Sequence, residues 1–150
     1  MSVWVDADAC PVVIKEILFR AARRARIIVT FVANQTLLVP ASPYIKTLQV
    51  AAIIDAADQA IVDRVTPEDL VITADIPLAV LVVRKGAQAL SPRGTLFDRE
   101  TIGPHAAMRD FLTDLRNTGT PTGGPATLTL ADRQNFANRL DAWLAQRQVL

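Results

Sequence analysis

The hydrophobic residues follow two alternating patterns along the first 90 positions of the chain. Uninterrupted apolar runs predict strands that are buried on both faces of a sheet. Between them, apolar residues recur at helical spacing and predict helices. The predicted strands are residues 2–5, 27–33, 70–73 and 87–90, with a further short strand within 45–54, and the predicted helices are residues 11–25, 56–65 and 77–85.

This alternation of strands and helices is typical of an α/β domain with a parallel sheet. Crossover connections in such sheets are right-handed, which places helices on both faces and produces three layers. Ligands bind at the carboxyl ends of the strands, near the point where the strand order reverses. The residues that follow each predicted strand are therefore the first candidates for a functional site.

The pattern changes after the last predicted strand. Residues 91–94 predict a turn, and amphipathic helices are predicted at residues 104–117 and 132–146. Residues 118–125 between them are rich in Gly, Pro and Thr and predict a loop. A chain of 150 residues has the size of one domain. We expect residues 1–150 to form a single domain, with the C-terminal helices (about residues 104–147) packed on its core.

Composition excludes several kinds of site. Cys10 is the only cysteine and His105 the only histidine, so there is no internal disulfide and no cysteine-based zinc site. No apolar run approaches the ~20 residues that span a bilayer, and the N-terminus has no signal-peptide pattern. We therefore expect a cytoplasmic protein without a membrane partner. The net charge of +1 identifies no partner by itself.

Aspartates gather where the predicted fold would bring loops together. Asp6 and Asp8 follow the first strand, Asp75 follows the strand at 70–73, and Asp55 and Asp58 lie near the start of a helix. Converging carboxylates repel one another, and a hard cation with oxygen ligands is the usual remedy. The sequence predicts an Mg²⁺ or Mn²⁺ site whose ligands are these five aspartates. Each of them except Asp55 is also a catalytic candidate.

Each aspartate also has a purely structural interpretation. Asp is favoured at helix N-termini and in turns, where its side chain accepts hydrogen bonds from backbone N–H groups. Asp8, Asp55 and Asp58 all fit that interpretation individually. Asp6 fits it less well, because it directly follows a buried strand. The joint pattern across three loops favours a site.

The remaining candidates each carry two interpretations. Cys10 precedes Pro11 at a helix start, which favours a thiolate, but most free cysteines are small buried hydrophobes. Arg93 could contact phosphate or pair with an aspartate. Lys15 belongs to a basic segment that reads as a solvated helix face or a phosphate-contacting edge. Asn34 ends a strand at the predicted site and could orient substrate or water. His105 is interpreted as a surface residue. Gly123 and Gly124 are interpreted as a turn or as an anion contact. The aromatic residues Trp4, Phe31 and Trp143 are assigned to the core or to a dimer face.

Several blocks of the sequence resemble the YaiI/YqxD family of bacterial proteins, also called UPF0178 or DUF188. They extend almost from end to end of the chain. The blocks are VDADACP at 5–11, ANQ at 33–35, DAAD at 55–58, DLVITADIPLA at 69–79, PRG at 92–94, and GGP at 123–125 followed by DR at 132–133.

The resemblance implies a PIN-like fold, because this family is grouped with the PIN-like superfamily of Mg²⁺- or Mn²⁺-dependent ribonucleases. It implies a parallel sheet of order 3-2-1-4-5. Asp6 would be the first PIN aspartate, Asp58 would begin the Asp-x-x-Ile pattern, and Thr73 and Asp75 would form the Thr-x-Asp pattern. The chain departs from that pattern between residues 35 and 54, where an expected acid is missing. Asp8 or Asp55 is left to compensate.

Three functions remain open from the sequence. The first is a metal-dependent nuclease for RNA or single-stranded nucleic acid, in which Arg93 or Lys15 holds the phosphate and Thr73 and Asn34 line the site. The second is a phosphatase with Asp6 as nucleophile, because Asp6 and Asp8 resemble the Asp-x-Asp opening of the haloacid dehalogenase family and Lys85 is available. The third is a non-catalytic module that binds RNA or protein. A homodimer is also left open.

Overall fold

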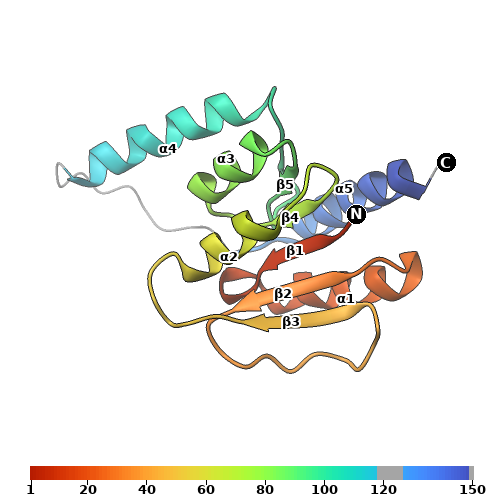
Figure 1. Cartoon of the computed structure of the whole chain (residues 1–150). Helices are drawn as coiled ribbons and strands as arrows, with labels where there is room; N and C mark the ends of the chain where they lie inside the picture. Colours follow the sequence, from red (N-terminus) through yellow and green to blue (C-terminus); the bar gives the residue numbers. More distant parts are fainter. Residues whose placement is uncertain (118–126, 149–150) are drawn as a thin grey trace.

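The computed structural model describes residues 1–117 and 127–148 (Figure 1). The predicted loop at 118–125, with Gly123 and Gly124, lies outside the described residues. The strands are β1 (Val3–Asp6), β2 (Val29–Ala33), β3 (Ile45–Gln49), β4 (Leu70–Ile72), β5 (Gln88–Leu90) and β6 (Leu96–Phe97). The helices are a 3-10 turn η1 (Ala7–Ala9), α1 (Val12–Ala25), α2 (Ala56–Arg64), α3 (Ile76–Arg84), α4 (Ile102–Asn117) and α5 (Leu130–Gln148).

The strands of the described residues form one sheet in the order β3-β2-β1-β4-β5-β6. The first five pair in parallel, and β6 pairs antiparallel with β5. The prediction of a three-layer α/β fold with a parallel 3-2-1-4-5 sheet is therefore confirmed. The two-residue β6 was not predicted, because so short a strand leaves no periodic pattern.

Two hydrophobic cores lie on opposite faces of the sheet, which explains why the apolar runs are continuous. α1 and α5 pack on one face, where Ile14, Leu18, Phe136 and Leu140 join the side chains of Val3 and Val5. α2 and α3 cover the other face through residues such as Ile61 and Leu78. Because side chains alternate along a strand, Asp6 shares a face with Trp4 and points toward the α2 and α3 side.

The two C-terminal helices differ in how they pack. α5 lies against α1 and the sheet, and its side chains Phe136, Leu140, Trp143 and Leu144 are buried. α4 runs alongside α3, and most of its described side chains are exposed, including Met108 (Figure 1). No helix of the described residues is long and apolar enough to cross a membrane.

Candidate functional site

Asp6 and Thr73 meet where the strand order reverses between β1 and β4. Val5 is in register with Ile72, so the next residues along the two strands, Asp6 and Thr73, lie side by side. The Thr73 hydroxyl donates a hydrogen bond of 3.1 Å to Asp6 Oδ2 and accepts one of 3.0 Å from the Asp75 N–H. The buried Thr73 side chain therefore links the ends of both strands and holds the Asp6 carboxylate in one orientation.

Asp75 and Asp58 approach Asp6 from the helices that follow. Asp75 is the N-cap of α3, and its Oδ1 accepts a hydrogen bond of 3.2 Å from the Leu78 N–H. Asp58 lies in the first turn of α2 and shares a side-chain hydrogen bond with Asp75. The structural interpretation as a cap is therefore correct for Asp75, which also faces a second carboxyl.

Burial and neighbouring charges raise the pKa of two of these carboxyls. The pKa of Asp58 is raised to about 6, first by burial and then by the charges of Asp75, Asp6 and Asp55 and by its hydrogen bond with Asp75. Burial also raises the pKa of Asp6; the Thr73 hydrogen bond lowers it, and Asp75 and Asp8 raise it further. The five aspartates, which we call the acidic site, thus act on one another as one electrostatic group.

Asp8 and Asp55 lie at the margin of the acidic site. Asp8 is exposed, and its Oδ2 accepts a hydrogen bond of 2.8 Å from the Asn34 backbone N–H. Asp55 precedes α2 in the left-handed conformation (φ 65°), and its side chain makes no capping hydrogen bond. Asp55 therefore occupies the N-cap position and lies in a turn, as its structural interpretation expects, but without the side-chain hydrogen bond of a cap.

The acidic site offers pairs of carboxylates. Among the described residues, no three His, Cys, Asp or Glu side chains lie close enough together to hold a metal ion as they stand. The donor chemistry nevertheless fits a hard cation, because every contributing group is a carboxylate or hydroxyl oxygen. Mg²⁺ keeps several waters and is usually bound through one or two carboxylates plus substrate phosphates. A pair such as Asp58 and Asp75 fits that kind of site.

Comparison with known proteins decides the family. The profile described as "Uncharacterized BCR, YaiI/YqxD family" (DUF188) matches residues 4–146. The chain belongs to the YaiI/YqxD family. A UPF0178 protein of Proteus mirabilis is 58% identical over 148 residues, which cover 99% of this chain and 98% of that protein. A UPF0178 protein of Aeromonas hydrophila is 57% identical over 149 residues, 99% of each chain. No solved structure matches.

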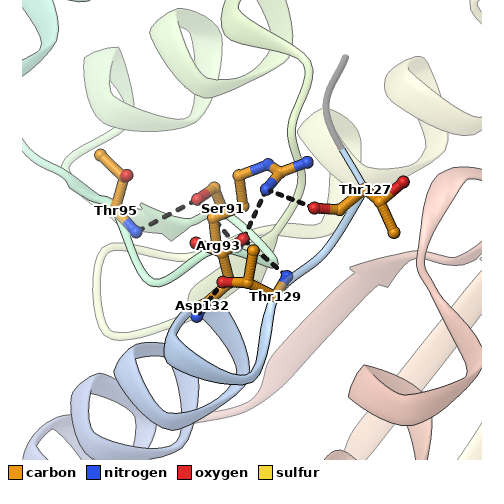
Figure 2. A network of polar contacts seen from close by, with 6 residues as sticks. All are labelled: Ser91, Arg93, Thr95, Thr127, Thr129 and Asp132. Carbon is orange, nitrogen blue, oxygen red and sulfur yellow. Dashed lines mark hydrogen bonds and ion pairs between the residues drawn. The ribbon is translucent and has the colours of Figure 1, made fainter.

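In this YaiI/YqxD protein, Arg93 pairs with an acid outside the acidic site. Its guanidinium pairs with Asp132, the acid at the start of α5, and donates a hydrogen bond of 3.5 Å to the Thr127 carbonyl (Figure 2). Asp132 also accepts a 3.0 Å hydrogen bond from the Thr129 N–H. That bond is the main cause that lowers the pKa of Asp132, and the Arg93 charge adds to it. Of the two interpretations of Arg93, a phosphate contact or an ion pair with an aspartate, the structure shows the ion pair.

The Cys10 thiol is not activated. It is buried against the sheet, and burial raises the pKa of Cys10 to about 12 although the charge of Lys15 lowers it. The interpretation as a small buried hydrophobe is confirmed. Lys15 lies on α1 close enough to act on that thiol. His105 is exposed and packs edge-on against Phe97, with ring centroids 4.9 Å apart.

A pocket of about 410 Å³ opens beside the acidic site on the α1 and α5 side of the sheet. The loops after β1, β4 and β5 and the segment before α5 form its walls. Its lining residues are Ala9, Pro11, Ala74, Ser91, Pro92, Arg93 and Leu128. Sequence reasoning missed Ser91, although its place directly after β5 was a usable signal. We call this cavity the switch-point pocket.

Asp69, which is not among the predicted site residues, is a buried structural acid. Its oxygens accept hydrogen bonds from the Ser2 N–H at 2.8 Å, the Trp4 indole N–H at 3.1 Å and the Thr66 N–H at 2.9 Å. Trp4 is thereby fixed at the amino end of the sheet. Phe31 and Trp143 are buried in the core.

Proposed function

We propose that this protein is a divalent-metal-dependent phosphodiester hydrolase that acts on RNA or other single-stranded nucleic acid in the cytoplasm. The observation that carries the proposal is the arrangement of Asp6, Thr73 and Asp75 where β1 and β4 end, in which the Thr73 hydroxyl joins the Asp6 carboxylate to the Asp75 backbone. Asp58 of α2 lies close to them, and burial and three neighbouring aspartates raise its pKa to about 6. Such repulsion opposes folding, and a cation shared by the carboxylates would remove it. The position of the acidic site, where the strand order reverses, supports the same proposal.

The roles follow from the contacts of each residue. Two of the carboxylates of Asp6, Asp58 and Asp75, such as the Asp58 and Asp75 pair, would hold Mg²⁺ or Mn²⁺ directly, and the third, with Asp8 and Asp55 at the margin, would act through the waters of the cation. Bound there, the cation would supply a water of lowered pKa and would polarise a phosphoryl oxygen. Thr73 positions the Asp6 carboxylate through its hydrogen bond, as the outer groups of metal sites usually do. Lys15 and Asn34 are proposed to contact the phosphate at the exposed margin near Asp8.

One contact counts against the phosphatase alternative. That mechanism needs a lysine beside the nucleophilic aspartate, and Lys85 was the candidate. Lys85 instead follows the last turn of α3, at the opposite end of that helix from Asp75. Its ammonium donates a hydrogen bond to the Val62 carbonyl of α2. Asp6 therefore has no contact with this lysine in the structure.

The test is cleavage of a fluorescein-labelled single-stranded RNA in Mn²⁺. We expect wild-type cleavage that EDTA abolishes, and a loss of about 100-fold or more in Asp6→Asn and Asp58→Asn. Asp63→Asn is the matched control, because Asp63 is an exposed acid of the same helix as Asp58 and contacts Gln59. Its rate should equal the wild-type rate.

Two results would reject the proposal. Equal cleavage by wild type and Asp6→Asn would show that the activity does not come from the acidic site. RNA binding that persists in EDTA, with no turnover in Mn²⁺, would select the non-catalytic module instead.

A further inference from the structure

The switch-point pocket shares two loops with the acidic site. Ala74 of the pocket lies between Thr73 and Asp75, and Ala9 is the neighbour of Asp8. The loops after β1 and β4 therefore carry both carboxylates of the acidic site and part of the pocket wall, so one extended substrate could contact both. The volume of about 410 Å³ falls within the usual range of small-molecule sites.

The walls of the pocket suit a flat ring. Most of them are apolar and are formed by the Pro11 and Pro92 rings, the Leu128 side chain and two exposed alanine methyl groups. Small and rigid wall groups leave room for a ring, and a rigid planar heterocycle gains contact area there without loss of rotamer freedom. None of the described lining residues is acidic.

The polar groups of the pocket come from one loop. The buried Ser91 Oγ accepts hydrogen bonds from the backbone N–H groups of Arg93 at 3.3 Å and Thr95 at 3.1 Å (Figure 2). Within the described part of the chain, no acceptor takes the Ser91 hydroxyl proton, so the hydroxyl is able to donate. Arg93 is held in place by Asp132 and adds positive charge to the wall. A ligand ring with acceptor atoms on its edge fits these donors.

We propose that the switch-point pocket binds a nucleobase of the nucleotide beside the phosphate that is cleaved. The inference rests on the proposed function for the identity of that phosphate. A base enters such a pocket only when it is unstacked and unpaired. The proposal therefore assigns single-stranded nucleic acid as the substrate class and requires a base, not only a sugar-phosphate backbone, beside the cleaved bond.

The first arm of the test measures base binding without hydrolysis. Uridine and adenosine are titrated into the ¹⁵N-labelled full chain, with ribose 5-phosphate as the base-free comparison. We expect both nucleosides to shift the amide signals of Ala9, Ala74 and Ser91, and ribose 5-phosphate to leave them unshifted. Nucleosides that shift none of these signals would overturn the proposal.

Variants that fill the pocket make the second arm. Ala9→Leu and Ala74→Leu come from different loops, and both alanines are exposed, so a larger side chain fits without entering the core. We expect each to weaken nucleoside binding at least about tenfold. Ala106→Leu is the matched control, because Ala106 lines a cavity of similar volume (about 390 Å³) between α3 and α4. Its affinity should equal that of wild type, and equal affinity in all four proteins would overturn the proposal.

The third arm separates this inference from the proposed function. RNA that carries an abasic residue on either side of a single cleavable bond is compared with intact RNA in Mn²⁺. Slower cleavage of the abasic RNA, by about tenfold or more, supports the base subsite. Equal cleavage of both overturns the subsite while the hydrolase stands. Nucleoside binding in the pocket by a protein that cleaves no RNA supports the subsite while the hydrolase falls.

Discussion

The aspartates at the two ends of the sheet have opposite surroundings. At the amino end, Asp69 is surrounded by donors and accepts hydrogen bonds from Ser2, Trp4 and Thr66. At the carboxyl end, Asp58 and Asp75 face each other, and burial with neighbouring negative charge raises the pKa of Asp58.

The difference indicates that Asp69 stabilises the fold and that the aspartates of the acidic site do not. A buried carboxylate with donors on every side favours folding, and a carboxylate beside other carboxylates opposes it. Repulsion between neighbouring carboxylates lowers stability, and proteins retain it mainly at sites where a ligand or a reaction uses the charges. Removal of the acid should therefore have opposite effects on stability at the two ends.

The largest effect is expected from Asp69→Ala. The substitution leaves the N–H donors of Ser2, Trp4 and Thr66 without their acceptor in a mostly buried setting. We expect the free energy of unfolding to fall by about 4 kcal/mol. Urea denaturation measured by circular dichroism checks this value.

Asp98→Ala provides the control for that measurement. Asp98 accepts hydrogen bonds from the Glu100 and Thr101 N–H groups at an exposed turn, where water replaces a lost acceptor. Its loss should cost about 1 kcal/mol or less. Equal losses in the two variants would mean that burial of Asp69 does not matter, and the contrast between the two ends would fail.

A second, smaller effect concerns how the carboxyl end is anchored. Gly94 has φ +91°, and a Cβ atom there would lie 2.6 Å from the Asn135 carbonyl carbon and 2.8 Å from the Phe136 nitrogen of α5. Gly94→Ala therefore forces α5 away from the sheet and strains the turn. We expect a loss of about 3 kcal/mol in the free energy of unfolding.

Gly103→Ala tests whether any glycine substitution would do the same. Gly103 lies in α4, and a Cβ atom there meets nothing within 4 Å. Because alanine is the better helix former, stability should stay constant or rise by about 0.5 kcal/mol. A Gly94→Ala protein as stable as wild type would show that α5 is not fixed at this turn.

Most of the sheet was predictable because buried parallel strands carry their own signature. The runs at 27–33 and 70–73 contain β2 and β4, and a parallel order follows once helices are known to separate the strands. The position of Asp6 beside Thr73 follows from the same topology. β6 was missed although the turn at residues 91–94 was predicted, because a strand of two residues leaves no periodic pattern after that turn.

The pairing of individual side chains was not predictable. Arg93 could have faced phosphate, and its placement on Asp132 depends on how α5 packs over residues 91–94. The role of Asp69 left no signal in the sequence, because its three donors are distant in sequence or lie in the backbone. Tertiary packing decides which way the carboxylate of a loop residue points. The sequence could therefore indicate which loops carry the aspartates of the acidic site, but not which groups these aspartates contact.

The smallest effect has the opposite sign and sharpens the comparison most. We expect Asp58→Asn to raise the free energy of unfolding by about 1 kcal/mol at pH 7.5, after allowance for the solvent exposure of Asp58. The amide keeps the shape of the side chain and removes the charge that Asp75, Asp6 and Asp55 repel. Urea denaturation with and without Mn²⁺ measures it.

The sign follows from the two pKa values of Asp58. The ordinary value of 3.8 applies to the unfolded chain, and the value in the folded protein is about 6. Between these values the folded state binds more protons, so stability falls as the pH rises through this window. The advantage of Asp58→Asn should therefore be absent below pH 3.8 and complete above about pH 6. Asp63→Asn, which removes an exposed acid of the same helix, is measured beside it as the matched control. Two results would contradict this account. In the first, Mn²⁺ raises the free energy of unfolding of wild type less than that of Asp58→Asn. In the second, Asp58→Asn is less stable than wild type at pH 7.5, and either result would mean that the carboxylates at this end do not repel one another.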